Sequence, residues 1–264
     1  MLIRINDINL DYRDQGHGAP VIFIHAFPLN QHMWDAQLEI LQTFCRVITV
    51  DLRGFGGSDS PPGPYTMDDM AADVRGLMKG LGIDRALLVG LSMGGYVSLA
   101  FYRNFPDALS GLVLADTRAT ADTPEARERR LKSAEKAERE GVHVIAEEMI
   151  PLLLGRTTRE SRQTVVDQVR RIIESNSSRG IAEAQRCMSA RPDSTHLLTM
   201  MNLPVLIIVG SEDTLTPVAE AESLRNAIPG AQLLVIEGAG HLTNLEHPDQ
   251  FNTALIKFIE QNAR

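Results

Sequence analysis

Short apolar runs rich in Val, Ile and Leu alternate along the chain with longer stretches in which apolar residues recur every three or four positions. Runs of the first kind are typical of strands buried on both faces of a parallel sheet, and stretches of the second kind are typical of helices that cover the sheet. The pattern therefore predicts an α/β fold with a mostly parallel, eight-stranded sheet flanked by helices. The predicted strands are 2–5, 8–13, 20–25, 46–51, 86–91, 111–116, 205–210 and 232–236.

The helical stretches show which of their faces is buried. In the stretch 66–81, apolar side chains recur at spacings of three and four residues, which indicates one buried helix face. These residues are Met70, Val74, Leu77, Met78 and Leu81. Outside residues 117–201, the predicted helices are 34–41, 66–81, 95–104, 218–227 and 248–261.

The strand pattern stops after residue 116 and resumes only near residue 202. A helical pattern fills this gap, so residues 117–201 are predicted to form a helical cap, or lid, inserted into a core domain made of residues 1–116 and 202–264. Thr123 followed by Pro124 is typical of a helix start. Gly141, Gly155 and Gly180 are expected to separate the helices. Such an insertion is expected to cover the carboxyl edge of the sheet.

The sequence Gly90-Leu91-Ser92-Met93-Gly94 follows a predicted strand and precedes a predicted helix. A serine hydroxyl becomes a nucleophile only where it is exposed, close to a base and beside preorganised amide donors. A sharp turn between strand and helix supplies the exposure, and the glycines two positions either side of Ser92 leave room where the backbones crowd together. Ser92 is therefore the candidate nucleophile, and an ordinary Gly-rich turn is the alternative.

A serine nucleophile needs a general base and a carboxylate that orients the base, and both follow Ser92 at later strand ends. Asp213 lies in the loop after strand 205–210, and His241 lies in the loop after strand 232–236. These two residues are the candidate acid and base. Asp116, at the end of strand 111–116, is the rival acid, although a capping role at the entrance to the lid is favoured for it.

The negative oxygen that develops during attack on a carbonyl group needs two hydrogen-bond donors. The backbone N–H of Met93 is one candidate, because it lies at a helix N-terminus directly after Ser92. The second candidate is the N–H of Phe27, in the sequence His25-Ala26-Phe27-Pro28 that follows strand 20–25. His25 is interpreted as a structural hydrogen-bonding residue, not as a second base.

Charge and composition exclude several classes of function. The formal net charge of the 264 residues is −8, which argues against binding of nucleic acid. The first five residues lack the basic region, apolar core and cleavage site typical of a secretory signal, and no apolar run approaches the ~20 residues needed to cross a bilayer. A cytoplasmic protein with no membrane partner is therefore expected. Cys45 and Cys187 are far apart and have no metal-ligand spacing, which predicts buried free thiols, no metal site and no cofactor.

Three motifs resemble those of the α/β-hydrolase family, and the likeness extends over essentially the whole chain. Gly90-Leu91-Ser92-Met93-Gly94-Gly95 is similar to the nucleophile elbow of that family. His25-Ala26-Phe27-Pro28 resembles its HGxP loop, and the run Asp51 to Asp59 resembles its DxRGxGxSD turn. The chain departs from the family pattern at Ala26, where glycine is frequent, and alanine tolerates positive φ less well than glycine. The serine at the elbow excludes the dehalogenase and epoxide-hydrolase branches, which carry aspartate there.

The resemblance implies a serine hydrolase that cleaves a small-molecule carboxylic ester or lactone without a cofactor. The chain looks most like the group of 3-oxoadipate enol-lactonases and small carboxylesterases, some of which show perhydrolase side activity. Two alternatives stay open, a small-molecule receptor on a hydrolase scaffold and a lyase or carbon–carbon hydrolase with the same triad. The residues expected to line the substrate pocket are Trp34, Met149, Leu153, Ile172 and Met188.

Overall fold

The computed structural model describes residues 1–262 and contains an eight-stranded sheet with the strand order β1-β2-β4-β3-β5-β6-β7-β8. Strands β3 to β8 are all parallel to one another. Strands β1 and β2 form an antiparallel hairpin at one edge, and β2 pairs antiparallel with β4. The predicted fold class is confirmed. The strands are β1 (Leu2–Ile5), β2 (Ile8–Gln15), β3 (Pro20–Ile24), β4 (Arg46–Val50), β5 (Ala86–Leu91), β6 (Leu109–Ala115), β7 (Val205–Gly210) and β8 (Gln232–Ile236).

Strand β2 is longer than the hydrophobic pattern predicts. Its polar end pairs with β4, where Asp14 lies opposite Ile48 and Gln15 opposite Val47. The Asp14 carboxylate accepts hydrogen bonds from Arg46 Nε and Nη2 at 3.0 and 2.7 Å. The strand therefore extends through polar residues because its partners on β4 supply both the backbone hydrogen bonds and an opposite charge.

Helices cover both faces of the central strands, and all six residues of β5 are buried. One face packs against α2, α3 and α10, and the other packs against α1 and α12. Alternate residues of β5 point to opposite faces of the sheet: Leu88 packs in the hydrophobic core on the α2 and α3 side, and Val89 packs in the core on the α1 and α12 side. The helices on these faces are α1 (Asp35–Leu41), α2 (Met67–Gly80), α3 (Met93–Asn104), α10 (Val218–Ala227) and α12 (Pro248–Asn262).

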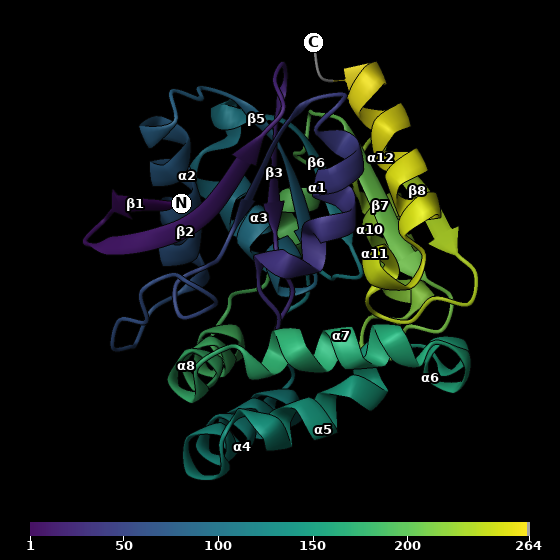
Figure 1. Cartoon of the computed structure of the whole chain (residues 1–264). Coiled ribbons are helices and arrows are strands. Elements are labelled where there is room, and N and C mark those ends of the chain that lie inside the picture. The colour runs from purple at the N-terminus through teal and green to yellow at the C-terminus, as the bar shows by residue number, and fades with distance from the viewer. Residues whose placement is uncertain (263–264) are drawn as a thin grey trace.

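Between β6 and β7 the chain forms a second group of helices, named here the cap helices, which lie together beyond one end of the sheet (Figure 1). Thr123 caps the first of them by accepting a hydrogen bond from Ala126 N, and Gly141 and Gly155 separate successive helices as expected. Whether they form a domain of their own stays a prediction. The cap helices are α4 (Pro124–Glu140), α5 (Val142–Leu153), α6 (Arg156–Ser161), α7 (Gln163–Glu174) and α8 (Ser178–Ser189).

Shorter helical segments complete the described chain. They are the 3-10 helices η1 (Gln31–Trp34) and η2 (Pro106–Ala108) and the short α-helices α9 (Thr195–Leu198) and α11 (Thr243–Glu246). Both cysteines are free and buried, as predicted. Within residues 1–262, no helix combines the length and apolar character that a membrane span requires.

The expectation that Gly180 separates two helices is wrong. Gly180 lies in the first turn of α8, where its N–H donates to the Ser177 hydroxyl. A Cβ atom at residue 180 would lie 1.7 Å from the carbonyl oxygen of Gly54. Glycine is therefore required at this position for close packing of α8 against the core, not for ending a helix.

Replacing Gly180 with alanine is expected to destabilise the protein although alanine is the better helix former. The gain in helix propensity is about 1 kcal/mol, whereas forcing a methyl group into a packed backbone contact costs about 1–3 kcal/mol or more. Urea denaturation should show a lower free energy of unfolding for Gly180→Ala. Arg179→Ala, at the exposed neighbouring position, is the control and should change it by no more than about 0.5 kcal/mol. An equal or higher stability of Gly180→Ala would contradict the packing argument.

Candidate active site

Ser92 lies at the turn between β5 and α3 and has a φ of 55° and a ψ of −110°. Such a backbone conformation is strained for a residue with a side chain, and close packing around the turn maintains it. A Cβ at Gly90 would lie 2.3 Å from the Gly94 carbonyl oxygen, and a Cβ at Gly94 would lie 2.1 Å from the Ile24 carbonyl oxygen. The two glycines therefore permit the turn that holds the Ser92 side chain at the end of the strand.

His241 links the two other residues singled out in the sequence. Its Nε2 lies 2.8 Å from Ser92 Oγ, and its Nδ1 lies 2.7 Å from Asp213 Oδ2. The His241 side chain is 2% exposed and that of Asp213 is 0% exposed. An ionised carboxylate only accepts hydrogen bonds, so Nδ1 carries the ring proton and Nε2 accepts a hydrogen bond from the Ser92 hydroxyl.

Asp213 is held as a carboxylate by the loop that carries it. Its Oδ1 accepts hydrogen bonds from Leu215 N and Thr216 N at 2.8 and 3.0 Å, and its Oδ2 accepts one from Thr216 Oγ1 at 2.6 Å. Burial acts to raise the pKa of Asp213, but His241 and these hydrogen bonds outweigh burial and lower the pKa below its ordinary value.

Asp116, the rival acid, forms no hydrogen bond with His241 in the described part of the chain. Its Oδ1 accepts a hydrogen bond from Gly210 N at 3.0 Å, and its Oδ2 is 2.5 Å from Thr243 Oγ1. Burial, together with the nearby negative charge of Asp213, raises the pKa of Asp116 well above its ordinary value. Asp116 thus joins the ends of β6 and β7 to α11 and favours the neutral form.

His25 shapes the loop that follows β3. Its Nε2 accepts a hydrogen bond from Leu52 N at 3.1 Å, and its Nδ1 lies 3.0 Å from Ala26 O. Burial lowers the pKa of His25, so the neutral ring is favoured, as its interpretation as a structural residue requires. Ala26 is not among the described residues with positive φ, so alanine replaces the frequent glycine without strain. This loop carries Phe27, one of the residues that line the cavity at Ser92.

A cavity of about 440 Å³ opens at Ser92 and His241 and is enclosed on its other side by residues of the cap helices. Met149 and Met188 line it, as expected. Met93, the first residue of α3, directly follows Ser92, and its N–H has no partner within the helix because of its place in the first turn. The cavity therefore combines the hydroxyl and imidazole groups with an open-mouthed space of a size that suits a small molecule.

The structure corrects the expectation for Trp34, Leu153 and Ile172, which pack in the hydrophobic core and do not line this cavity. Trp34 is fully buried, with its ring 5.1 Å from that of Phe23. On α5 it is Leu152, not Leu153, that lines the cavity. Neighbouring helical residues point about 100° apart, so Leu153 is directed into the core instead.

Sequence reasoning missed Glu246, a fully buried carboxylate five residues after His241. Its Oε1 accepts hydrogen bonds from Gly240 N at 2.9 Å and Leu242 N at 3.3 Å, on either side of the histidine. Its Oε2 accepts one from Gly155 N, at the junction of α5 and α6, at 2.9 Å. Burial raises the pKa of Glu246. One side chain therefore joins the His241 loop to the cap helices, a role that depends on contacts between distant segments and has no local sequence signal.

The comparisons with known proteins identify the family of the fold. Residues 19–248 match the model of a family described as the alpha/beta hydrolase fold. The chain belongs to the alpha/beta hydrolase family. The predicted resemblance is therefore confirmed. Among the described residues 1–262, no cluster of three or more His, Cys, Asp or Glu side chains could hold a metal ion.

Individual relatives cover nearly the whole chain. The 3-oxoadipate enol-lactonase 2 of Acinetobacter baylyi is 30% identical over 251 residues, which is 94% of this chain and 92% of the relative. A thermophilic esterase from Thermogutta terrifontis, solved with malate bound, is 43% identical with a TM-score of 0.97 and covers 100% of this chain and 99% of its own. The enol-lactonase of Burkholderia xenovorans LB400 is 29% identical with a TM-score of 0.92 and covers 98% of this chain and 100% of its own.

Glu246→Gln is expected to lower the free energy of unfolding by about 1–3 kcal/mol, the cost of leaving a buried donor without an acceptor. Glutamine has one acceptor oxygen, so the N–H of either Gly155 or Gly240 would face the NH₂ group. Glu237→Gln makes the same exchange at an exposed position and should leave stability nearly unchanged. Urea denaturation of both variants measures the difference, and equal stability of Glu246→Gln and the unchanged protein would contradict the role given to Glu246.

Proposed function

We propose that the protein is a serine hydrolase that cleaves carboxylic esters or lactones through an acyl-enzyme intermediate. The observation that carries this proposal is the continuous hydrogen-bonded chain from Ser92 Oγ through His241 to Asp213, with distances of 2.8 and 2.7 Å. Its members come from the loops after β5, β7 and β8. In this arrangement the imidazole can remove the hydroxyl proton as the oxygen attacks, while the carboxylate stabilises the imidazolium that forms.

The reaction needs no group beyond the chain and water. Ser92 Oγ attacks the carbonyl carbon and its proton passes to His241 Nε2. The bond to the leaving oxygen then breaks, and that oxygen takes the proton from His241. Water attacks the resulting acyl-Ser92 ester in the same way, which releases the acid and restores the hydroxyl. In a lactone the leaving oxygen stays attached to the acyl group.

We assign the stabilisation of the negative oxygen to the backbone N–H groups of Phe27 and Met93. Met93 begins α3 directly after Ser92, so the dipole of the helix adds a favourable potential there. Phe27 lines the same cavity as Ser92 and His241. Each such donor typically contributes about 3–4 kcal/mol to lowering the barrier.

The choice of esters and lactones as substrates is supported by the names of the relatives. The similar proteins include an esterase from Thermogutta terrifontis and an enol-lactonase from Burkholderia xenovorans LB400. A cavity of about 440 Å³ lies within the size range of small-molecule sites, which runs from about 300 to 1,000 Å³. The substrates proposed are therefore small esters and lactones.

Ser92→Ala is expected to lower kcat for p-nitrophenyl acetate or p-nitrophenyl butyrate by about a thousandfold or more, because the alanine variant has no nucleophile. Ser223→Ala, an exposed serine of α10, is the control and should keep full activity. Wild-type turnover by Ser92→Ala would contradict the proposal. A single slow turnover by the unchanged protein would favour the receptor instead, and steady-state rates after any initial burst distinguish the two.

Replacement by asparagine is expected to affect activity strongly at Asp213 and little at Asp116. Asp213→Asn should lower kcat by about 10³- to 10⁴-fold, because the amide no longer favours the required histidine tautomer. Asp116→Asn should stay within about threefold of the unchanged protein, since an amide resembles the neutral acid that the surroundings of Asp116 favour. Steady-state kinetics with the same ester measures both, and a larger loss in Asp116→Asn would contradict the assignment.

A further inference from the structure

Three arginines surround a single buried carboxylate beside the cavity. Asp122, whose side chain is 0% exposed, lies 2.9 Å from Arg118 Nη2, 2.5 Å from Arg130 Nε and 2.9 Å from Arg191 Nη1. Three positive charges and one negative charge leave two positive charges uncompensated in this group. The chain as a whole has a net charge of −8, so the excess is local and opposite to the overall charge.

All members of this group except Arg191 belong to the wall of the cavity that contains Ser92. Arg118, Asp122 and Arg130 all line it together with Ser92 and His241. Arg118 directly follows Thr117, whose hydroxyl donates a hydrogen bond to the Ser92 carbonyl oxygen at 2.8 Å. The backbone of Arg118 is thus fixed next to the turn that carries Ser92, which places a long cationic side chain in the same compartment as the Ser92 hydroxyl.

The three arginines differ in how many of their donors are engaged. Arg130 donates to Asp122, Gln185 and Met188. Arg191 donates to the carbonyl oxygens of Met188 and Thr120 and lies over the Tyr96 ring, 4.0 Å from its centroid.

For Arg118, by contrast, the only acceptor within residues 1–262 is Asp122, which Nη2 contacts, and its buried Nε has no partner there. A guanidinium carries five N–H donors. Arg118 engages only one of its five donors in this way, so it is the member of the group with the most donors free for a ligand.

Other charged groups around the cavity do not cancel this excess. Glu148 also lines the cavity, but it pairs with Lys136. Arg129 lines the cavity and forms no salt bridge within the described residues. Glu220 forms no salt bridge with Arg118 within the described residues and acts on it only at longer range. Burial acts to lower the pKa of the Arg118 guanidinium, but Tyr96, Asp122 and Glu220 outweigh burial and raise it.

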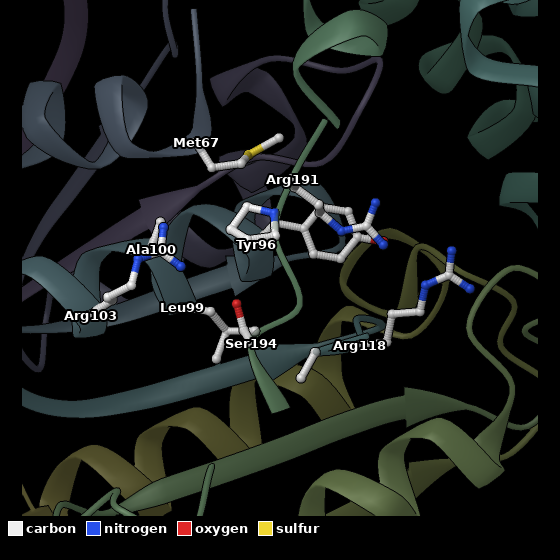
Figure 2. A pocket seen from close by; sticks show the side chains of 10 residues that line it. Met67, Tyr96, Leu99, Ala100, Arg103, Arg118, Arg191 and Ser194 are labelled. Carbon is white, nitrogen blue, oxygen red and sulfur yellow. The ribbon is translucent and has the colours of Figure 1, made fainter. Parts of the chain in front are cut away.

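A second, smaller cavity shares Arg118 and Tyr96 with the first and is bounded by Arg103 and Arg191 as well (Figure 2). Its volume is about 10 Å³, which is room for no more than about one water molecule. The free donors of Arg118 can therefore meet an organic anion only in the larger cavity, next to Ser92.

We propose that the substrates carry a free carboxylate in addition to the ester or lactone group, and that Arg118 binds this carboxylate while the carbonyl group lies at Ser92. This inference rests on the proposed function and narrows its substrate class to half-esters of dicarboxylic acids and lactones bearing an acid group. A cleft whose walls carry excess positive charge concentrates anions, and a guanidinium with free donors gives a carboxylate a charge-assisted hydrogen bond.

The test compares pairs of substrates that differ by one charge and little else. The ethyl half-esters of succinate, glutarate and adipate are matched with their amide analogues, in which CONH₂ replaces the carboxylate. Hydrolysis is followed in a pH-stat at neutral pH and low salt. For at least one chain length, kcat/KM for the half-ester should exceed that for the amide by about tenfold or more, and added NaCl should reduce this preference.

In Arg118→Gln, kcat/KM for the half-ester should exceed that for the amide by no more than about threefold, while the rate with the neutral amide is retained. Arg118→Lys should keep part of the preference, and urea denaturation shows whether either variant is folded. Arg103→Gln is the matched control, because Arg103 also pairs with one aspartate and has a similar exposure, 24% against 23% for Arg118, but lies outside the Ser92 cavity. The control should keep the full preference.

Each other outcome overturns a defined part of the account. Equal or better hydrolysis of the amides at every chain length, or a preference that persists in folded Arg118→Gln, would overturn the inference and leave the proposed function intact. If no ester is hydrolysed, whether neutral or charged, then the proposed function fails and the inference fails with it.

Discussion

Keeping one carboxylate ionised inside the protein is the constraint on which the site depends. A buried carboxylate without partners takes up a proton, yet Asp213 keeps a pKa below its ordinary value because two backbone N–H groups, the Thr216 hydroxyl and His241 all donate to it. These bonds also fix the orientation of the His241 ring. The unprotonated nitrogen therefore faces the Ser92 hydroxyl, and in the proposed mechanism this nitrogen removes the hydroxyl proton.

Asp116 shows what happens to a buried carboxylate that has fewer such partners. It lies at the same edge of the sheet, but burial and the charge of Asp213 raise its pKa well above the ordinary value. Two carboxylates thus have opposite protonation preferences because their surroundings differ, and only one negative charge is stabilised beside His241. The arginine group around Asp122 extends this division of charge to the cap side of the cavity, where positive charge is in excess. The cavity is therefore lined both by the Ser92 and His241 side chains and by a cationic group.

The sequence was sufficient to predict the sheet, most helices and the positions of Ser92, Asp213 and His241, because apolar periodicity and the order of strand ends are local properties of the chain. The sequence was not sufficient to predict the role of a residue whose position depends on contacts with a distant segment of the chain. Glycine is required at residue 180 because the carbonyl group of Gly54 leaves no room for a side chain. Leu152, not Leu153, lines the cavity because the rotation of α5 about its axis depends on the residues it packs against. Glu246 could not be found either, since its partner Gly155 is 91 residues away along the chain.

The central claim is that Ser92 is an activated nucleophile. Its most direct test is treatment of the protein with an ethyl p-nitrophenyl alkylphosphonate, an ester mimic that forms a stable bond with an activated serine. The account predicts one phosphonyl group per chain, found by peptide mass spectrometry on Ser92, and loss of ester hydrolysis in proportion to labelling. Modification of a different residue, or ester hydrolysis that persists once Ser92 is fully modified, would contradict it.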